Sequence, residues 1–291
     1  MGYMHIDNLY KDTTLLMFKE CYALEKIHGT SAHIKWDPSN PDKIHYFAGG
    51  EKHENFVSVF NEGDLINRFK EQFATYSNPI TVFGEAYGGK QQGMRETYGP
   101  NLKFIAFDVQ VGKVWLSVPD AHDVCNSLGI EFVYYNKVNT DMDSLNAERD
   151  RESQQAIRNG MGPGKKSEGV VLRPIIELTR NNGARIIVKH KRDDFRETKT
   201  PRVVDPNQQR IYEEAEEIAC EYVTDMRLIH VLDKLPKDIN IESIPVVIKA
   251  MVDDIYREAH DIVQSKEATK AIGKHTVQAF KRYLNKKVNE V

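Results

Sequence analysis

The stretch "LEKIHGTSAHIKWD", residues 24–37, places a lysine, a histidine, a glycine and a threonine within five consecutive positions. It then alternates apolar and polar residues in the manner of a β-strand. Lys26 stands at the end of a possible strand, and Gly29 permits a turn geometry that residues with a Cβ resist. Taken alone, this pattern fits an exposed lysine beside a hairpin. It becomes informative only with other short motifs farther along the chain.

Length and charge limit the classes of protein that fit this chain. Its 291 residues of ordinary globular composition can bury one large core or two smaller ones, and two domains are a reasonable expectation. The formal net charge is −3, from 40 Lys and Arg against 43 Asp and Glu, so no strongly basic surface indicates a nucleic-acid partner. Any face that binds phosphate must therefore be local.

The cysteines and the apolar runs indicate the compartment. Cys21, Cys125 and Cys220 are odd in number, far apart and not in paired ligand spacing, which argues against a disulfide framework or a zinc cluster. No apolar run approaches the roughly 18 residues that a membrane helix needs, and the N-terminus lacks the apolar centre of a signal peptide. We therefore expect a cytoplasmic protein without a membrane association.

The distribution of patterns divides the chain in two. Up to about residue 200, short β-rich runs such as "ITVFGEAYGG" and "ARIIVKHK" alternate with Gly, Asn and Pro breaks, which predicts an α+β domain with antiparallel sheets over residues 1–202. A polar, Pro-containing linker is expected at 198–210. Amphipathic patterns after it predict a small all-helical domain over 207–291, with helices at 207–234, 243–264 and 270–288.

Four further motifs follow the first one in the α+β half. Glu85 interrupts the apolar run "VFGEAYGG", and Phe107 lies within "FIAFDV", where a core position is the usual interpretation of an aromatic residue. Glu168 opens the apolar run of "KKSEGVVLRP", where a buried charge needs a partner. Lys189 and Lys191 are two residues apart in "RIIVKHK", so on a strand their ammonium groups share one face and repel unless an anion lies between them.

As an ordered set, these motifs resemble those of the covalent nucleotidyltransferase superfamily of polynucleotide ligases and capping enzymes. Within it, "EKIHGT" is similar to the nucleotide-acceptor motif of the RNA ligase 2 type, because DNA ligases and capping enzymes usually carry Asp where His28 stands. "FGEAYGG", "FIAFDV", "SEGVVLRP" and "IIVKHK" resemble the subsequent motifs in the expected order. The resemblance covers most of residues 20–200, and the helical tail also resembles the RNA ligase 2 arrangement, where other members carry an OB domain.

The resemblance implies a role for each matched residue. Lys26 would be the nucleophile that becomes lysyl-AMP, Glu25 and Ile27 would lie beside the adenine, and His28 would be needed around the phosphates. Glu85 would engage the ribose or the surroundings of the nucleophile, and Glu85 and Glu168 would bind a metal ion. Phe107 would stack on adenine, and Lys189 and Lys191 would hold the phosphates.

The chain departs from the family pattern after the nucleophile. Ser31 follows Thr30 where the family often has Asn, and no arginine occurs between Lys26 and Arg68 to match one that the family commonly uses on this strand. The basic residues available as replacements are Lys43, Lys52, Lys90 and Arg95.

The implied chemistry is ATP-dependent RNA ligation. A free lysine amine has a pKa of about 10.4, and neighbouring lysines, burial and a Mg²⁺ (or Mn²⁺) ion all disfavour its proton. The resemblance implies that Lys26 takes AMP from ATP, that AMP passes to an RNA 5′-phosphate, and that a 3′-hydroxyl then displaces it, with nicks in duplex RNA as the expected substrate. The alternatives are another polynucleotide ligase, a capping nucleotidyltransferase, or a non-enzymatic protein that binds RNA ends. No protein partner is indicated.

Overall fold

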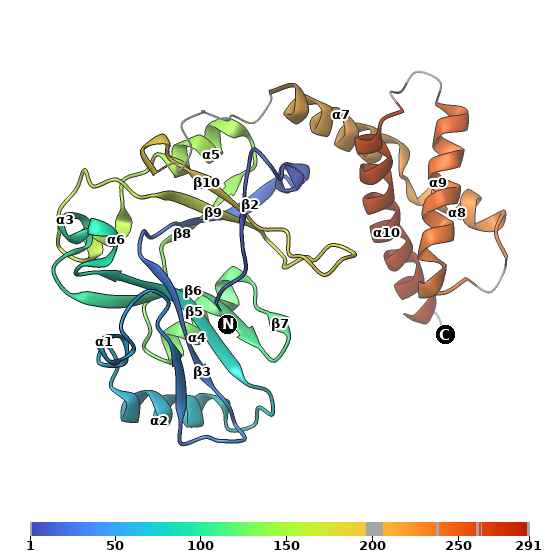
Figure 1. Ribbon diagram of the computed structural model, residues 1–291. Helices are drawn as coiled ribbons and strands as arrows, with labels where there is room; N and C mark the ends of the chain where they lie inside the picture. Colours follow the sequence, from blue (N-terminus) through green and yellow to red (C-terminus); the bar gives the residue numbers. More distant parts are fainter. Residues whose placement is uncertain (1, 196–205, 237–238, 260–261, 263, 290–291) are drawn as a thin grey trace. The chain divides into compact units, whose positions relative to one another are not determined.

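The computed structural model describes residues 2–195, 206–236, 239–259, 262 and 264–289 (Figure 1). The chain divides into two compact units, Met1–Arg202 and Val203–Val291. Each unit has a hydrophobic core of its own. Within the described ranges, no helix is long and apolar enough to cross a membrane.

The first sheet of the first unit contains the strand β2, which ends directly before Lys26. Its strands, in spatial order, are β1 (Asp7–Asn8), β10 (Val188–Lys191), β9 (Gly169–Pro174), β2 (Glu20–Glu25) and β8 (Tyr135–Asn139). All neighbours pair antiparallel except β1 and β10, which are parallel. Because β2 lies between β9 and β8, the end of β2 comes beside the start of β9, where Glu25 pairs with Val170.

The second sheet is entirely antiparallel. Its strands, in spatial order, are β4 (Ile44–Phe47), β3 (Thr30–Trp36), β5 (Ile80–Gly88), β6 (Leu102–Val111) and β7 (Val114–Trp115). Side chains of β3 alternate between buried and half-buried positions, as the apolar and polar alternation of the sequence predicts. The chain passes from one sheet to the other between β2 and β3, through Lys26, Ile27, His28 and Gly29.

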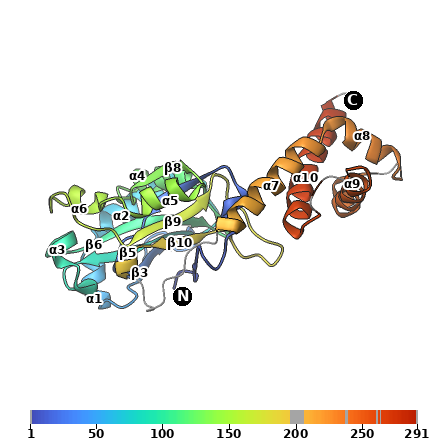
Figure 2. The same cartoon turned by 90° about the horizontal axis from the view of Figure 1, so that it is seen from above.

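Short helices cover the sheets of this unit (Figures 1 and 2). They are α1 (His53–Val57), α2 (Glu62–Phe73), α3 (Arg95–Tyr98), α4 (Val118–Ser127), α5 (Met142–Arg149) and α6 (Gln154–Arg158), with 3₁₀ turns at Thr14–Met17, Gln91–Gly93 and Asp193–Phe195. On α2, Phe69 stacks on Trp36 of β3 with ring centroids 5.5 Å apart. The helix α4 packs on β6, and α5 packs on the first sheet.

The described part of the second unit consists of helices only. They are α7 (Pro206–Tyr222), α8 (Asp225–Asp233), α9 (Ile244–Glu258) and α10 (Lys266–Asn289), with a 3₁₀ turn at Ile241–Ser243 before α9. The expected α+β fold with antiparallel sheets, followed by a helical tail, is therefore confirmed.

Several boundaries differ from those expected. The helix predicted at 207–234 is two helices, because Thr224 begins a new one by accepting a hydrogen bond from the Arg227 backbone N–H. The helix predicted at 243–264 ends at Glu258. The last five residues of the expected linker, 206–210, already belong to α7, whereas 198–205 lie outside the described residues. The helix predicted at 270–288 begins earlier, at Lys266.

Candidate active site

A cavity of about 430 Å³ lies between the two sheets. Its walls come from the N-terminal segment, from both sheets and from the turn between β2 and β3. The lining residues that matter below are Tyr3, Glu25, Lys26, Ile27, Ser31, Glu85, Phe107, Arg173 and Lys189. The volume falls within the range of about 300–1,000 Å³ that is usual for small-molecule sites.

Six of the residues predicted to bind nucleotide thus line one cavity, although they come from four separate parts of the sequence. They are Glu25, Lys26, Ile27, Glu85, Phe107 and Lys189. The other three, His28, Glu168 and Lys191, do not line it. Glu168 contacts the cavity residue Lys26, and His28 and Lys191 both contact Glu168.

Glu168 is the centre of that connection. Its Oε2 accepts a hydrogen bond from Lys26 Nζ at 2.9 Å and lies 2.9 Å from His28 Nδ1. Its Oε1 forms an ion pair with Lys191 Nζ at 2.8 Å. Burial raises the pKa of Glu168, but the hydrogen bond with His28, the charge of Lys26 and the hydrogen bonds with Lys191 and Lys26 outweigh it and lower the pKa to about 2. The buried carboxylate is therefore ionised and holds three basic side chains together.

Backbone contacts fix the position of Lys26 relative to Glu168. The Lys26 N–H donates to the carbonyl oxygen of Gly169 at 2.9 Å, which ties the end of β2 to the residue directly after Glu168. Gly29 is required for close packing: a Cβ there would lie 2.3 Å from the carbonyl oxygen of Ala86. It is not among the glycines with positive φ, so the reason expected from the sequence, an unusual turn geometry, is wrong.

Glu85 faces the same group of charges from β5. It accepts a hydrogen bond from the Gly29 backbone N–H at 3.1 Å. Burial raises the pKa of Glu85 to about 7, since the attraction of Lys26 only partly offsets burial and the negative charge of Glu168 adds to it. The two carboxyl groups of the site consequently differ in charge at slightly acid pH, with Glu168 ionised and Glu85 largely protonated.

The side chain of Glu25 is used within the protein. Its Oε1 accepts from the Ser153 hydroxyl at 2.6 Å, and its Oε2 accepts from the backbone N–H groups of Gln154 and Gln155 at 3.1 Å each. These N–H groups belong to the first turn of α6, where a carboxylate is favourable. Glu25 therefore positions α6 through its carboxylate, while Ile27, also buried, gives the cavity an apolar surface.

Phe107 stands in the cavity wall, supported by the N-terminal segment. The Tyr3 ring meets it edge to face, with centroids 4.9 Å apart. The Tyr3 hydroxyl donates to Asp108 Oδ2 at 2.6 Å. Because Phe107 is only partly buried in the core, one part of its ring remains available to the cavity.

The buried charge cluster behind Phe107 was not predicted from the sequence. Asp108 is fully buried and pairs with Arg173 at 3.0 Å and with Arg185 at 2.6 Å. Glu177 bonds both arginines as well. Arg173 stands in the apolar run "GVVLRP", where a buried cation requires carboxylates nearby, and that signal was available in the sequence.

A second unpredicted feature is the hydroxyl of Ser31. Its Oγ is buried at the cavity and has no hydrogen-bond partner among the described residues. The four basic residues considered as replacements for the missing arginine, Lys43, Lys52, Lys90 and Arg95, are exposed and do not line the cavity. The basic groups that do line it include Lys26, Arg173 and Lys189.

The site fits a divalent cation through the chemistry of its donors. Glu85 and Glu168 offer carboxylate oxygens, which hard cations such as Mg²⁺ and Mn²⁺ prefer. The raised pKa of Glu85 also fits, because a second positive charge nearby would favour its ionised form.

Comparison with known proteins gives the family of this chain. The sequence profile of the RNA ligase family matches residues 19–191, more than half of the chain. This chain belongs to the RNA ligase family. No curated protein sequence matches it.

Solved structures of Naegleria gruberi RNA ligase variants are similar in fold. Three of them, each with ATP and manganese, have 14% sequence identity and a TM-score of 0.50, and the match covers 67% of this chain. It covers only 56% or 57% of the Naegleria chains, so this chain spans less than two thirds of their length. The likeness shows that the first unit has the fold of an RNA ligase.

Proposed function

We propose that this chain is an ATP-dependent RNA ligase that joins RNA 3′-hydroxyl and 5′-phosphate ends through lysyl-AMP and RNA-adenylate, in the repair of nicks. One observation carries the proposal: Lys26 lines a cavity of nucleotide size and contacts a buried carboxylate that also holds His28 and Lys191. Membership of the RNA ligase family and the ATP found with its Naegleria relatives support it.

In the first step, the nitrogen of Lys26 attacks the α-phosphorus of ATP. The Lys26 nitrogen gives one proton to solvent before the attack and a second one after it, a P–N bond forms, the bond from the α-phosphorus to the bridging oxygen breaks, and pyrophosphate leaves. The base of ATP would lie between Phe107 and Ile27, which supply the aromatic and apolar surfaces of the cavity. Lys189 on the cavity wall would hold the phosphates, and Lys191 would contribute its charge from behind Lys26.

Glu168 accounts for how the nucleophile is positioned and released. As long as its Oε2 holds the Lys26 ammonium, the amine has no free lone pair. Glu85 and Glu168 would hold a divalent cation beside the bound nucleotide. A bound Mg²⁺ or Mn²⁺ would supply charge neutralisation at the phosphates.

In the later steps, AMP moves from Lys26 to the 5′-phosphate of RNA, forming a pyrophosphate linkage and freeing the amine. A 3′-hydroxyl then attacks the activated phosphate, a phosphodiester bond forms, and AMP leaves. Both are in-line displacements at phosphorus, in which the Lys26 nitrogen leaves in the first and a phosphate oxygen of AMP leaves in the second, and positioning and charge neutralisation provide most of the catalysis.

The test is transfer of label from nucleotide to protein. The full chain with Mg²⁺ and α-labelled ATP should acquire label that resists base and is lost in acid, as a phosphoramidate is. Lys26→Ala should not be labelled, whereas Lys113→Ala should be labelled normally, because Lys113 is exposed in the turn between β6 and β7. Equal labelling from GTP would point to a capping nucleotidyltransferase. No labelling from either nucleotide would point to a protein that only binds RNA ends.

For the second unit, we propose a role in holding the RNA. Its hydrophobic core is formed by its own helices, while every residue assigned to the lysine chemistry lies before residue 192. A chain that ends at Arg202 should therefore still form lysyl-AMP but seal nicked RNA poorly. Sealing at the rate of the full chain would contradict this role.

A further inference from the structure

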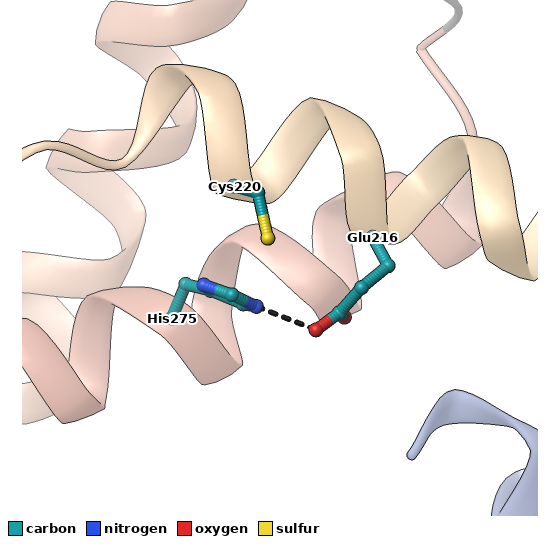
Figure 3. A group of neighbouring side chains, drawn as sticks. All are labelled: Glu216, Cys220 and His275. Carbon is teal, nitrogen blue, oxygen red and sulfur yellow. Dashed lines mark hydrogen bonds and ion pairs between the residues drawn. The ribbon is translucent and has the colours of Figure 1, made fainter. Parts of the chain in front are cut away.

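Within the part of the chain that the structure describes, one group of three side chains combines the ligand types of a transition-metal site. Glu216 and Cys220 lie one turn apart on α7, and His275 lies on α10 (Figure 3). Their ligand atoms all lie within 4.8 Å of one another. We propose that this group, the α7–α10 triad, binds Zn²⁺ and fastens α7 to α10.

The packing of the two helices creates the triad. Glu216 and Cys220 are four residues apart, so they project from the same face of α7. The preceding residues, Ala215 and Ala219, are buried in the core that α7 and α10 share. Because these side chains are small, the helices approach closely enough for His275 to reach the face of α7.

The observed geometry is close to that of a coordinated ion. His275 Nε2 lies 2.7 Å from Glu216 Oε1, and the Cys220 side chain points towards the same imidazole (Figure 3). Tetrahedral zinc with bonds of about 2.0–2.3 Å requires ligand atoms about 3.5 Å apart. Small side-chain adjustments would therefore admit the ion between Glu216 and His275 with Cys220 as third ligand and solvent as fourth.

The choice of cation follows from ligand type and charge. Thiolate and imidazole favour zinc over the hard cations that suit Glu85 and Glu168. On binding, the Cys220 thiol loses one proton to solvent, and the thiolate and the Glu216 carboxylate together balance the two charges of Zn²⁺. His275 binds as neutral imidazole through Nε2, with its proton on Nδ1.

An ion pair alone explains only part of this arrangement. Lys274 Nζ lies 3.2 Å from Glu216 Oε1, so Glu216, Lys274 and His275 form a stable surface cluster without metal. That cluster gives no role to Cys220. Free cysteine is normally among the most buried residues, as Cys21 and Cys125 are here, but Cys220 is exposed beside the imidazole and the carboxylate.

The full chain is first stripped of metal and kept reduced with a reductant that contains no thiol. Co²⁺ then serves as a spectroscopic probe for the zinc site. A cobalt–thiolate bond gives a charge-transfer band in the near ultraviolet that carboxylate sites lack, so ions at the candidate active site do not contribute. The wild type should develop this band with one Co²⁺ per chain, and Zn²⁺ should remove it. Cys220→Ser should abolish the band, whereas Cys125→Ala should keep it, because Cys125 is buried in the first unit.

Two further variants test the other ligands. His275→Ala should weaken Co²⁺ binding at least 10-fold. Lys274→Met should strengthen it, because Lys274 competes with the metal for Glu216. Zn²⁺ should also raise the unfolding temperature of the helical unit in the wild type but not in Cys220→Ser. Absence of the band in the wild type, or its persistence in Cys220→Ser, would overturn the proposal.

Discussion

Glu168 Oε2 lies 2.9 Å from the Nζ of Lys26, although the two residues are 142 positions apart in the sequence. The contact exists because β2 and β9 are neighbours in one sheet, and the Lys26 N–H bonds to Gly169. The same carboxylate contacts His28 and Lys191. A single buried anion therefore decides where the proposed nucleophile and two further basic groups lie.

Replacing Glu168 should affect the first chemical step strongly. Glu168→Gln keeps the size of the side chain but removes the charge that holds Lys26 and Lys191. We expect the rate of self-adenylylation to fall by about 10²-fold or more, the scale for losing one preorganised electrostatic contact. Glu20 lies on β2 and forms an exposed ion pair with Lys137. Glu20→Gln therefore serves as the matched control and should keep the full rate. A Glu168→Gln protein that labels at the wild-type rate would show that the cluster has no part in catalysis.

Glu85 should make the stability of the first unit depend on pH. Its pKa is raised by burial from 4.5 to about 7, so between these values the folded chain holds a proton that the unfolded chain has lost. Stability from this group is therefore present below pH 4.5 and falls as pH rises to 7. One pKa unit corresponds to about 1.4 kcal/mol, so Glu85 contributes at most about 3 kcal/mol to the free energy of unfolding.

Glu85→Gln isolates this contribution, because glutamine can still accept the Gly29 hydrogen bond but cannot ionise. Urea unfolding between pH 4.5 and 7.5, followed by tryptophan fluorescence, should show a smaller loss of stability with pH for the variant than for the wild type. Parallel pH profiles for the two proteins would show that Glu85 titrates near its usual value.

Ser31 should contribute to binding but not to folding. Its Oγ is buried at the cavity and has no partner among the described residues, so a bound nucleotide would be the first group to satisfy it. Ser31→Ala should raise the KM for ATP by about 2- to 10-fold, which corresponds to one hydrogen bond. Its free energy of unfolding should stay the same or increase. An unchanged KM would mean that the hydroxyl faces away from the nucleotide.

Asp108 should be important for stability. It is fully buried and bonded to Arg173, Arg185 and Tyr3, and removing one partner from a buried ionic group costs about 3–5 kcal/mol. We therefore expect Asp108→Asn to lower the free energy of unfolding by about 3 kcal/mol. The two tryptophans, Trp36 and Trp115, both belong to the first unit, so their fluorescence follows its unfolding.

The control for Asp108 is Asp42→Asn. Asp42 is exposed and forms only a surface pair with Lys70, so its loss should cost less than about 1 kcal/mol. Equal losses for the two variants would mean that the Asp108 cluster is not held as tightly as its contacts indicate.

The sequence predicts the fold better than it predicts the site. The alternating residues of β3 and the order of the motifs correctly indicate a β-rich region followed by a helical one. They do so because hydrophobic periodicity is a local property of the sequence. The break at Thr224 was missed because an apolar pattern can continue across two helices, whereas the cap that separates them depends on one side chain.

The limits at the site have another cause. Lys26, Glu85 and Phe107 were found because they stand within motifs, whereas Tyr3 and Ser31 become part of the cavity only when the chain folds. The contacts of Arg173 with Asp108 and of His275 with Glu216 join residues that are 65 and 59 positions apart. Such pairings are set by strand order and helix packing, which no spacing in one sequence reveals.

The central claim is that Lys26 is the residue that accepts AMP. Its most direct test is peptide mass spectrometry of the full chain after incubation with ATP and Mg²⁺, without RNA. The account predicts one adenylate per chain, on the peptide that contains Lys26, with Lys189 and Lys191 unmodified. AMP on either of those lysines, or no adenylate on a folded chain that binds ATP, would contradict it.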